Sequence, residues 1–287
     1  MEIAFFERNG GQLVPTEVAQ SLWSKDQMHG VAVSGARGLI GEQKVLDLGR
    51  DDLVPARHTV DLFRPAKMAP CDLVADVVRE GNRLALVDVR LEQGGELMAR
   101  ASVLFLKATE EPPGEVWKAT DLPTPPPLDV APPTTDPRPP LFFSADGWSA
   151  DFLAHQNAEH KTIWNTVPWI VAGEQPSSFA AAAAAADSTT LTTNWGTKGV
   201  NYINSDVTLT LARRPVSGEI GLCALDHTSY DGISVGSALV FDREGPLGTS
   251  IVTALANAKR TVDFGNAFKR DIDGGSGDVA SDPTTRV

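Results

Sequence analysis

The chain has 287 residues, enough for about two domains of average size. Its 42% hydrophobic and 22% charged residues are typical of globular proteins and exclude collagen-like, wholly disordered and disulfide-rich classes. The formal net charge of −12 argues against a nucleic-acid partner, because phosphate backbones are bound by clustered cations. A small anionic ligand stays possible, since it could be held by local cations such as Lys67, Lys198, Arg213 and Arg214.

The sequence also predicts where the protein works. The longest apolar run covers residues 179–186 and is mostly alanine, whereas a membrane-spanning helix needs roughly 20 apolar residues. We therefore expect no membrane partner. The N-terminus lacks the basic start and the cleavage site of an export signal, so we expect a cytoplasmic location. The two cysteines, Cys71 and Cys223, are predicted to be reduced thiols in strands, not a disulfide or a metal site.

The first half of the chain reads as one helix followed by a sheet. Residues 28–43 are predicted to form the helix, with Gly30, Ser34 and Gly38 on a small-residue face that allows close approach to a sheet. Alternating apolar residues then predict four antiparallel strands. The predicted strands are residues 57–63, 71–78, 84–91 and 97–106.

A proline-rich segment and a second unit of the same kind follow. Residues 109–140 contain eleven of the twenty prolines, which favours an extended connector. An alanine-rich helix is expected at residues 176–187, with a proline at its first turn. Four more strands are predicted at residues 206–212, 219–226, 233–241 and 247–255. The predicted domains are residues 1–108 and 141–262, with a disordered tail at 263–287.

The two halves are related by a repeat. Arg64-Pro65 after a strand corresponds to Arg214-Pro215 after another, at an offset of 150 residues. The hairpin turn at Gly94-Gly95 corresponds to Glu244-Gly245 at the same offset. A helix followed by a curved antiparallel sheet, used twice in one chain, predicts an α+β fold of the double-hotdog type.

At this point the sequence resembles acyl-CoA thioesterase II and its actinobacterial relatives, over most of residues 15–260. The most specific motif is Asn204-Ser205-Asp206-Val207-Thr208-Leu209, followed by Arg214-Pro215 and Gly218-Glu219. Ala186-Asp187, Gly173-Glu174 and Met28-His29-Gly30 agree with the same family pattern. The resemblance implies hydrolysis of an acyl-coenzyme A thioester in lipid metabolism, without a cofactor or a metal. It also implies a homodimer or a larger homo-oligomer.

The resemblance further implies a water molecule activated by an Asp, with a Thr and a Gln beside it. Asp206 matches the family Asp and Thr228 the family Thr, whereas Val252 stands where the Gln is expected. Valine cannot orient water. Either Thr249, Ser250 or Thr253 replaces the Gln, or the mechanism differs, or the site binds acyl groups without hydrolysis.

Each of these residues also has a physical rationale. Asp206 could act as general base if burial raises its pKa, or could be a strand-end Asp bonded to backbone N–H groups. Thr228 could orient the Asp or its water, or simply suit a strand. At the 150-residue offset Asp206 corresponds to Ala56 and Thr228 to Val78, so the duplicate site is predicted to be inactive.

His29 and Gly30 open the first predicted helix, whose N-terminal N–H groups can stabilise the oxyanion of a thioester. We expect His29 to be neutral there, because a cation is unfavourable at the positive end of a helix. Asp187, at the end of the second helix, could line the pocket, but we favour a capping role over it.

Three other sequence patterns are typical of functional sites, but we favour a structural interpretation of each. Ser234 lies in a Gly-x-Ser-x-Gly pattern, but a strand-like stretch follows it where a nucleophile elbow needs a helix. His155 and His160 are five residues apart, which does not suit a helical zinc site. The aromatic residues Trp148, Phe152, Trp164 and Trp169 are expected to form a domain-interface core rather than a ligand cage.

Three functions therefore compete. The leading hypothesis is an acyl-CoA hydrolase with one site, built from the N-terminus of the first helix and Asp206. The alternative is a non-hydrolytic acyl or acyl-CoA binding protein on the same scaffold. A serine esterase that uses Ser234 is the third.

Overall fold

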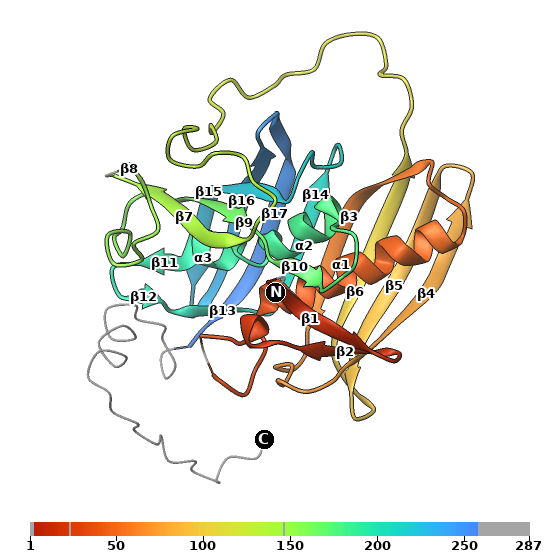
Figure 1. The fold of residues 1–287 in the computed structure, drawn as a ribbon. Coiled ribbons are helices and arrows are strands. Elements are labelled where there is room, and N and C mark those ends of the chain that lie inside the picture. Colours follow the sequence, from red (N-terminus) through yellow and green to blue (C-terminus); the bar gives the residue numbers. More distant parts are fainter. Residues whose placement is uncertain (1–2, 23, 146, 258–287) are drawn as a thin grey trace.

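The computed structural model describes residues 3–22, 24–145 and 147–257; the predicted tail at 263–287 lies outside these residues. One antiparallel sheet of twelve strands dominates this part of the chain and curves around two helices (Figure 1). The helices are α1 (Gly30–Asp47), α2 (Ser178–Ala186) and the short α3 (Thr189–Asn194). None of the helices in the described residues has the length and the apolar character needed to cross a membrane.

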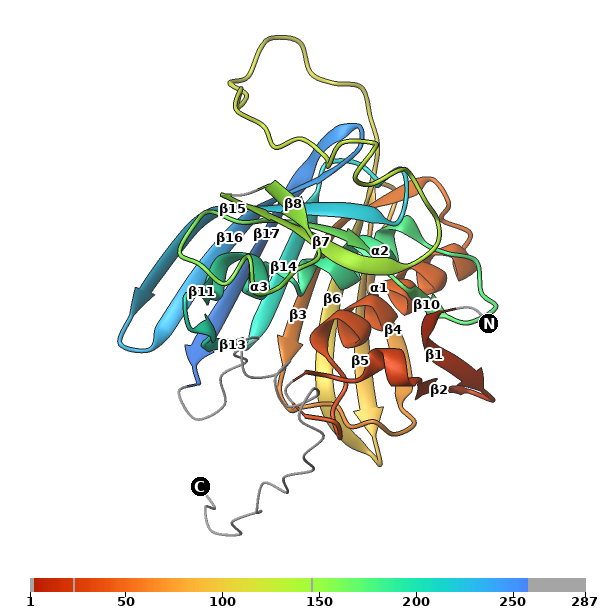
Figure 2. The same ribbon diagram turned by 60° about the vertical axis from the view of Figure 1, so that its left-hand side comes forward.

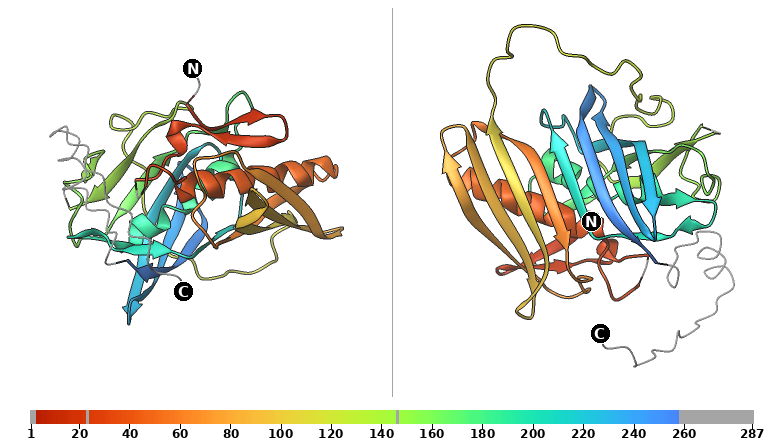
Figure 3. Two further views of the ribbon diagram at one scale, coloured as in Figure 1. Left: turned by 90° about the horizontal axis from the view of Figure 1, so that it is seen from below. Right: turned by 180° about the vertical axis from the view of Figure 1, so that it is seen from behind.

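The sheet has a mirrored strand order. It runs β4-β5-β6-β3-β14-β17-β16-β15-β9-β7-β8, and β13 also pairs with β17. Its strands are β3 (Leu53–Leu62), β4 (Asp72–Gly81), β5 (Leu84–Gln93), β6 (Glu96–Lys107), β7 (Arg138–Ser144), β8 (Gly147–Ser149), β9 (Thr162–Thr166), β13 (Tyr202–Asn204), β14 (Asp206–Leu211), β15 (Glu219–Tyr230), β16 (Ile233–Asp242) and β17 (Gly245–Ala256). Figure 3 shows from behind how the strands of the two halves continue one another. The eight strands predicted from alternation are therefore confirmed, within a few residues at their ends.

Smaller elements complete the fold. A second sheet has the order β10-β1-β2 and contains β1 (Ala4–Asn9), β2 (Gln12–Pro15) and β10 (Trp169–Val171). A two-stranded sheet pairs β11 (Trp195–Gly196) with β12 (Gly199–Val200), and the 3-10 helix η1 covers Glu17–Ala19. Figure 2 shows β1 and β2 beside the start of α1. Because β1 pairs in parallel with β10, the N-terminal segment is held against the second half.

A pseudo-twofold axis relates the halves at an offset of 149 residues, not the 150 of the sequence motifs. Thr59 and Thr208, which are 149 residues apart, share a hydrogen bond where β3 pairs with β14. Ser34 donates to the carbonyl of Ala183, also 149 residues away, where α1 crosses α2. The difference matters because a shift of one residue turns every strand side chain to the opposite face of the sheet.

The predicted small-residue face of α1, with Gly30, Ser34 and Gly38, packs against α2 and not, as expected from the sequence, against a sheet. A Cβ added to Gly38 would lie 2.7 Å from the Cβ of Ala183, and one added to Gly35 would lie 2.9 Å from that of Ala184. The alanines of α2 are buried because α1 covers one side of this helix and sheet covers the other. Two helices of small residues thus pass at short range inside the curved sheet.

Polar contacts fasten the two halves and the connector. Glu42 of α1 bonds with Ser177, at the N-cap of α2, and with Arg214 of the second half. The proline-rich segment is anchored at Ala131, which is buried and accepts a hydrogen bond of 2.7 Å from Arg243. The limits of the predicted domains and connector stay predictions.

Candidate active site

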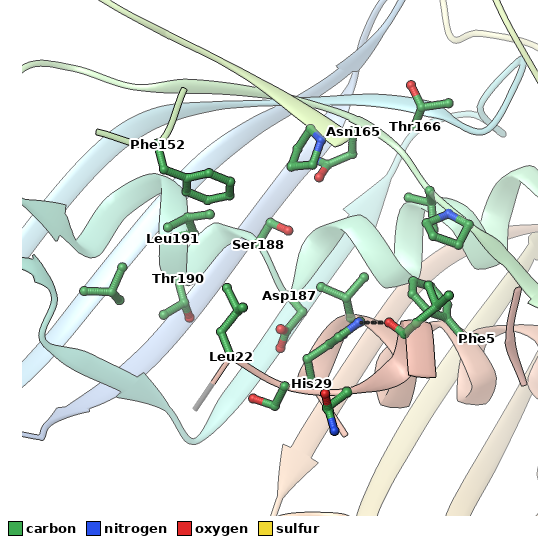
Figure 4. A pocket seen from close by; sticks show the side chains of 18 of the residues that line it. Phe5, Leu22, His29, Phe152, Asn165, Thr166, Asp187, Ser188, Thr190 and Leu191 are labelled. Carbon is green, nitrogen blue, oxygen red and sulfur yellow. Dashed lines mark hydrogen bonds between the residues drawn. The ribbon is translucent and has the colours of Figure 1, made fainter. Parts of the chain in front are cut away.

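A cavity of about 380 Å³ opens at the N-terminus of α1, between the two halves. This volume lies within the usual range for small-molecule pockets. Most of its wall is apolar and comes from the N-terminal segment, β9 with the loop that follows it, α3 and β12 (Figure 4). The apolar side chains are Phe5, Val18, Leu22, Val31, Pro140, Phe152, Val167, Pro168, Leu191 and Val200.

Asp187 lines this cavity and lies directly against the start of α1. It is the C-cap residue of α2, and its carboxylate packs on Gly30: a Cβ added to Gly30 would lie 2.2 Å from Oδ1 of Asp187. The two residues meet because α1 and α2 cross in opposite directions, so the end of one helix reaches the beginning of the other (Figure 4). Of the two roles weighed for Asp187, its side chain has the first, because it lines the cavity; at the end of α2 only its backbone N–H makes the helix-ending hydrogen bonds.

The surroundings of Asp187 have opposing effects on its pKa. Burial raises the pKa of Asp187, whereas the hydrogen bond of 2.9 Å from Nδ2 of Asn204 and the charge of Arg37 lower it. Arg37 is fully buried in α1, and its three guanidinium nitrogens have no hydrogen-bond partner within the described residues. Burial lowers the pKa of Arg37 to about 9, so Arg37 still carries a positive charge at pH 7. Asp187 is thus a partly buried carboxylate with one amide donor and one buried counter-charge.

His29 is the N-cap of α1 and lines the same cavity. Its Nδ1 accepts the N–H of Ala32 at 3.1 Å, and its Nε2 lies 3.0 Å from the carbonyl of Val18. This pair of contacts suits a neutral ring that is protonated at Nε2. Burial lowers the pKa of His29, which also favours the neutral form. Both ring nitrogens are therefore occupied, and the ring positions the helix start.

Two backbone donors stay open at this helix start. The N–H groups of Gly30 and Val31 have no acceptor among the residues that the structure describes. The first N–H groups of a helix carry partial positive charge and bind anions. They lie beside the Asp187 carboxylate, so a carboxylate and two N–H donors stand together on the wall of a largely apolar cavity.

The structure does not bring Asp206 or Thr228 to this site. The inward side chains of β14 are Val207 and Leu209, so Asp206 faces the opposite surface of the sheet. Its carboxylate accepts the backbone N–H of Thr253 at 3.1 Å, which is the strand-end role considered from the sequence. Thr228 is exposed on β15, opposite Val235, and does not line the cavity.

The structure also shows where Val252 lies, and where the residues considered as replacements for the family Gln lie. Val252 is fully buried in the core beneath the helices. Ser250 accepts a hydrogen bond from Thr189, and Thr249 bonds with Thr210, so neither hydroxyl lines the cavity. Asn204 was noted from the sequence only as part of a motif; the structure shows that it holds Asp187.

The serine, histidine and aromatic patterns that the sequence analysis disfavoured as functional sites have other roles in the structure. Ser234 lies inside β16 and donates to Asn194, so it is not at a strand-to-helix turn. The ring of His155 bonds with Ser144 and Ser149, and His160 bonds with the carbonyl of Ala224. Among the four aromatic residues, Phe152 lines the cavity, while Trp164 is buried against Phe241 and Arg243.

The pseudo-symmetric position of the site is filled. At the offset of 149 residues, Gly38 takes the place of Asp187 and Phe179 takes the place of Gly30. The ring of Phe179 is fully buried and packs against Phe105 and His58. A glycine and a buried phenylalanine ring therefore stand where the site has its carboxylate and its glycine, and these are not the residues that the 150-residue offset indicated.

Comparison with known proteins identifies the family. The model of the acyl-CoA thioesterase N-terminal domain matches residues 20–106, and that of the C-terminal domain matches residues 119–256. No curated protein matches the sequence.

Solved structures share the fold at low sequence identity. A tesB protein of Mycobacterium avium subsp. paratuberculosis superposes with a TM-score of 0.60 and 14% identity, over 88% of this chain and 94% of that one. A hot dog fold protein of unknown function from Alicyclobacillus acidocaldarius superposes with a TM-score of 0.62 and 19% identity, over 88% of this chain and 96% of that one. An acyl-CoA thioesterase II of Mycobacterium marinum superposes with a TM-score of 0.56 and 14% identity, over 79% of this chain and 88% of that one. Since the two family models together span most of the sequence, the chain belongs to the acyl-CoA thioesterase family of thioester hydrolases, with the double-hotdog fold that its sequence predicts.

Proposed function

We propose that the protein hydrolyses acyl-coenzyme A thioesters at the single site formed by Asp187 and the N-terminus of α1. One observation carries this proposal: the Asp187 carboxylate packs directly on Gly30, beside two open N–H groups, on the wall of a largely apolar cavity. A carboxylate can take a proton from water, and the helix N-terminus can stabilise the charge that then develops on the carbonyl oxygen. The cavity provides the apolar surface that an acyl group needs.

The reaction follows from this geometry. A water oxygen attacks the thioester carbonyl carbon while Asp187 takes a proton from that water. The carbonyl oxygen becomes an oxyanion at the N–H groups of Gly30 and Val31. When the intermediate collapses, the carbon–sulfur bond breaks and the leaving thiolate takes the proton from Asp187. The products are a free carboxylic acid and coenzyme A.

This assignment replaces Asp206 and Thr228 as the proposed catalytic residues and keeps Gly30 at the oxyanion. His29 is proposed to position the helix start, because both of its ring nitrogens are already used. The missing Gln at Val252 does not leave Asp187 without an amide, since Asn204 donates to its carboxylate. A cytoplasmic location, a role in lipid metabolism and assembly into a homodimer or larger oligomer stay predictions.

Turnover of acyl-CoA esters tests the proposal against the non-hydrolytic alternative. We expect the protein to release free thiol from at least one member of a panel of straight-chain and aromatic acyl-CoA esters, as measured with a thiol reagent. Calorimetry would report binding of the same esters. Tight binding with no thiol release from any ester would contradict the proposal and establish an acyl-CoA binding protein.

The charge of Arg37 predicts the pH dependence of this activity. Asp187 must be ionised to act as a base, so kcat/KM is expected to fall on the acid side as Asp187 becomes protonated. Arg37 lowers the pKa of Asp187, so replacing Arg37 with Met raises that pKa and should move the acid limb to higher pH. Arg37→Lys, which keeps a positive charge, should leave the limb closer to that of the wild type. An unmoved limb in Arg37→Met, with turnover retained, would show that Arg37 does not act on the base.

A further inference from the structure

The outer face of the large sheet carries an exposed apolar surface near the end of β17. Val252 and Ala254 of this strand are fully buried, so the residues that alternate with them face away from the helices. Apolar side chains of β13, β16 and β17 on this outer face are between 37% and 56% exposed. They form the outer patch, which consists of Ile203, Ile233, Val235, Ile251 and Leu255.

The side chains of the outer patch form one continuous surface because their strands are neighbours. Leu255 lies opposite Ile203 of β13 and Ile233 of β16, and Val235 lies opposite Thr253 of β17. Side chains directly opposite each other on paired strands are about 4.5–5.5 Å apart. In the view from behind in Figure 3, the strands of this face lie in front of the helices. A continuous exposed apolar surface of this kind is typical of a contact with another segment or molecule.

The border of the outer patch is acidic. Asp206 and Asp61 lie directly opposite each other where β14 pairs with β3, and Asp206 accepts the N–H of Thr253. Neither carboxylate forms an ion pair with another of the described residues. Arg100 lies opposite Asp61 on the other side but pairs with Asp88. Because like charges directly opposite each other are unfavourable in a sheet, this border favours a basic partner.

The sequence continues from this surface with apolar and basic residues. β17 ends at Ala256 beside the outer patch, and the C-terminal family model also ends at residue 256, whereas the sequence extends to residue 287. Phe264, Phe268 and Ile272 recur at every fourth position, which predicts one apolar face of a helix. Residues 258–272 contain four basic residues and two acidic ones. The basic residues are Lys259, Arg260, Lys269 and Arg270.

The same stretch has the sequence signals for the start and the end of a helix. Thr261 suits an N-cap, Asp263 falls in the first turn, and Gly274-Gly275 follows the last apolar residue. Lys269 and Arg270 fall toward the C-terminal end of the predicted helix, where cations are favourable. Helices shorter than about 12–15 residues are marginal in water by themselves, so this one needs a surface for its apolar face.

We propose that residues 262–272 form an amphipathic helix that packs on the outer patch of the same chain, with basic side chains toward Asp61 and Asp206. A helix of these residues is about 16 Å long. The distance along β17 from Ile251 to Leu255 is about 14 Å at the usual rise of a strand, so the two lengths agree. The inference does not depend on the proposed function, and it limits the predicted disordered tail to residues 273–287.

Amide hydrogen exchange of the full chain, followed by mass spectrometry, tests this inference without any turnover. In the wild type we expect the amides of residues 262–272 to exchange at least about tenfold more slowly than in a synthetic peptide of residues 258–287. Val235→Lys places a charge in the outer patch, so it should abolish this protection. Val74→Lys is the matched control, because Val74 is a similarly exposed valine on the outer face of β4 in the first half, and the protection should persist.

A second variant changes the proposed helix and leaves the sheet as it is. Phe268→Ser should also abolish the protection, and it does so without altering any residue of the folded strands. Wild-type exchange at the rate of the peptide would overturn the inference, as would protection that survives both Val235→Lys and Phe268→Ser. Exchange is measured at two protein concentrations. Protection that appears only at the higher concentration would also overturn the inference, because a second copy of the chain would then cover the outer patch.

Discussion

Replacing Asp187 with Asn is expected to lower kcat for acyl-CoA hydrolysis by about 10²- to 10⁴-fold, the usual contribution of a general base. Asparagine has nearly the same shape as aspartate, so Asn204 keeps a partner and the cavity keeps its wall. The variant should fold, because it removes a carboxylate whose charged form is disfavoured by burial. The measurement is thiol release under saturating substrate, with thermal unfolding as the check on folding.

The matched control is Asp206→Asn. Asp206 faces away from the helices and bonds to the backbone of Thr253, so kcat should stay within about twofold of the wild type, as for a change outside the reacting groups. The opposite pattern, with full activity in Asp187→Asn and none in Asp206→Asn, would restore the assignment that the sequence motif suggested.

The second large effect is expected for Gly30→Ala. A Cβ at this position would lie within 2.5 Å of three atoms of the Asp187 carboxylate, so the carboxylate or the helix start must move. A displacement of about 1 Å at reacting groups can cost roughly 100-fold in rate. We therefore expect kcat/KM to fall by about 10- to 100-fold, as measured by thiol release.

The change at Gly30 should act on the site more than on the fold. Alanine restricts the unfolded chain more than glycine does, which offsets part of the strain by about 0.4–1 kcal/mol. Gly81→Ala is a suitable control, because a Cβ there meets no atom within 4 Å and the backbone is not left-handed. Equal activity of Gly30→Ala and the wild type would show that the contact between Gly30 and Asp187 is not part of the reacting geometry.

Local patterns in the sequence predicted the elements well where one face of an element is buried. Residues 84–91 and 233–241 alternate between apolar and polar side chains, and both are strands in the structure. The short helix α3 was not predicted, because Thr189–Asn194 is rich in β-branched threonine, which lacks a strong helix signal. The pairing of β1 with β10 was also missed, since it joins segments more than 150 residues apart.

The geometry of the candidate site depends on details that alternation does not reveal. Asp206 matched a family motif, but its neighbours Val207 and Leu209 are buried, and the two-residue period of a strand then directs Asp206 away from the helices. The alternation within β14 itself could have indicated this, because Val207 and Leu209 are apolar and Asp206 then lies on the other face of the strand.

The sequence by itself determined that a unit of helix and antiparallel sheet is used twice, that a proline-rich segment joins the copies, and that His29 and Gly30 begin a helix. These features depend on residues close together in the chain, so periodicity and turn residues encode them. Only the tertiary structure decided which carboxylate meets that helix. Asp187 and Gly30 come together because α1 and α2 cross in opposite directions within one curved sheet, and such a contact depends on packing between distant segments rather than on local pattern.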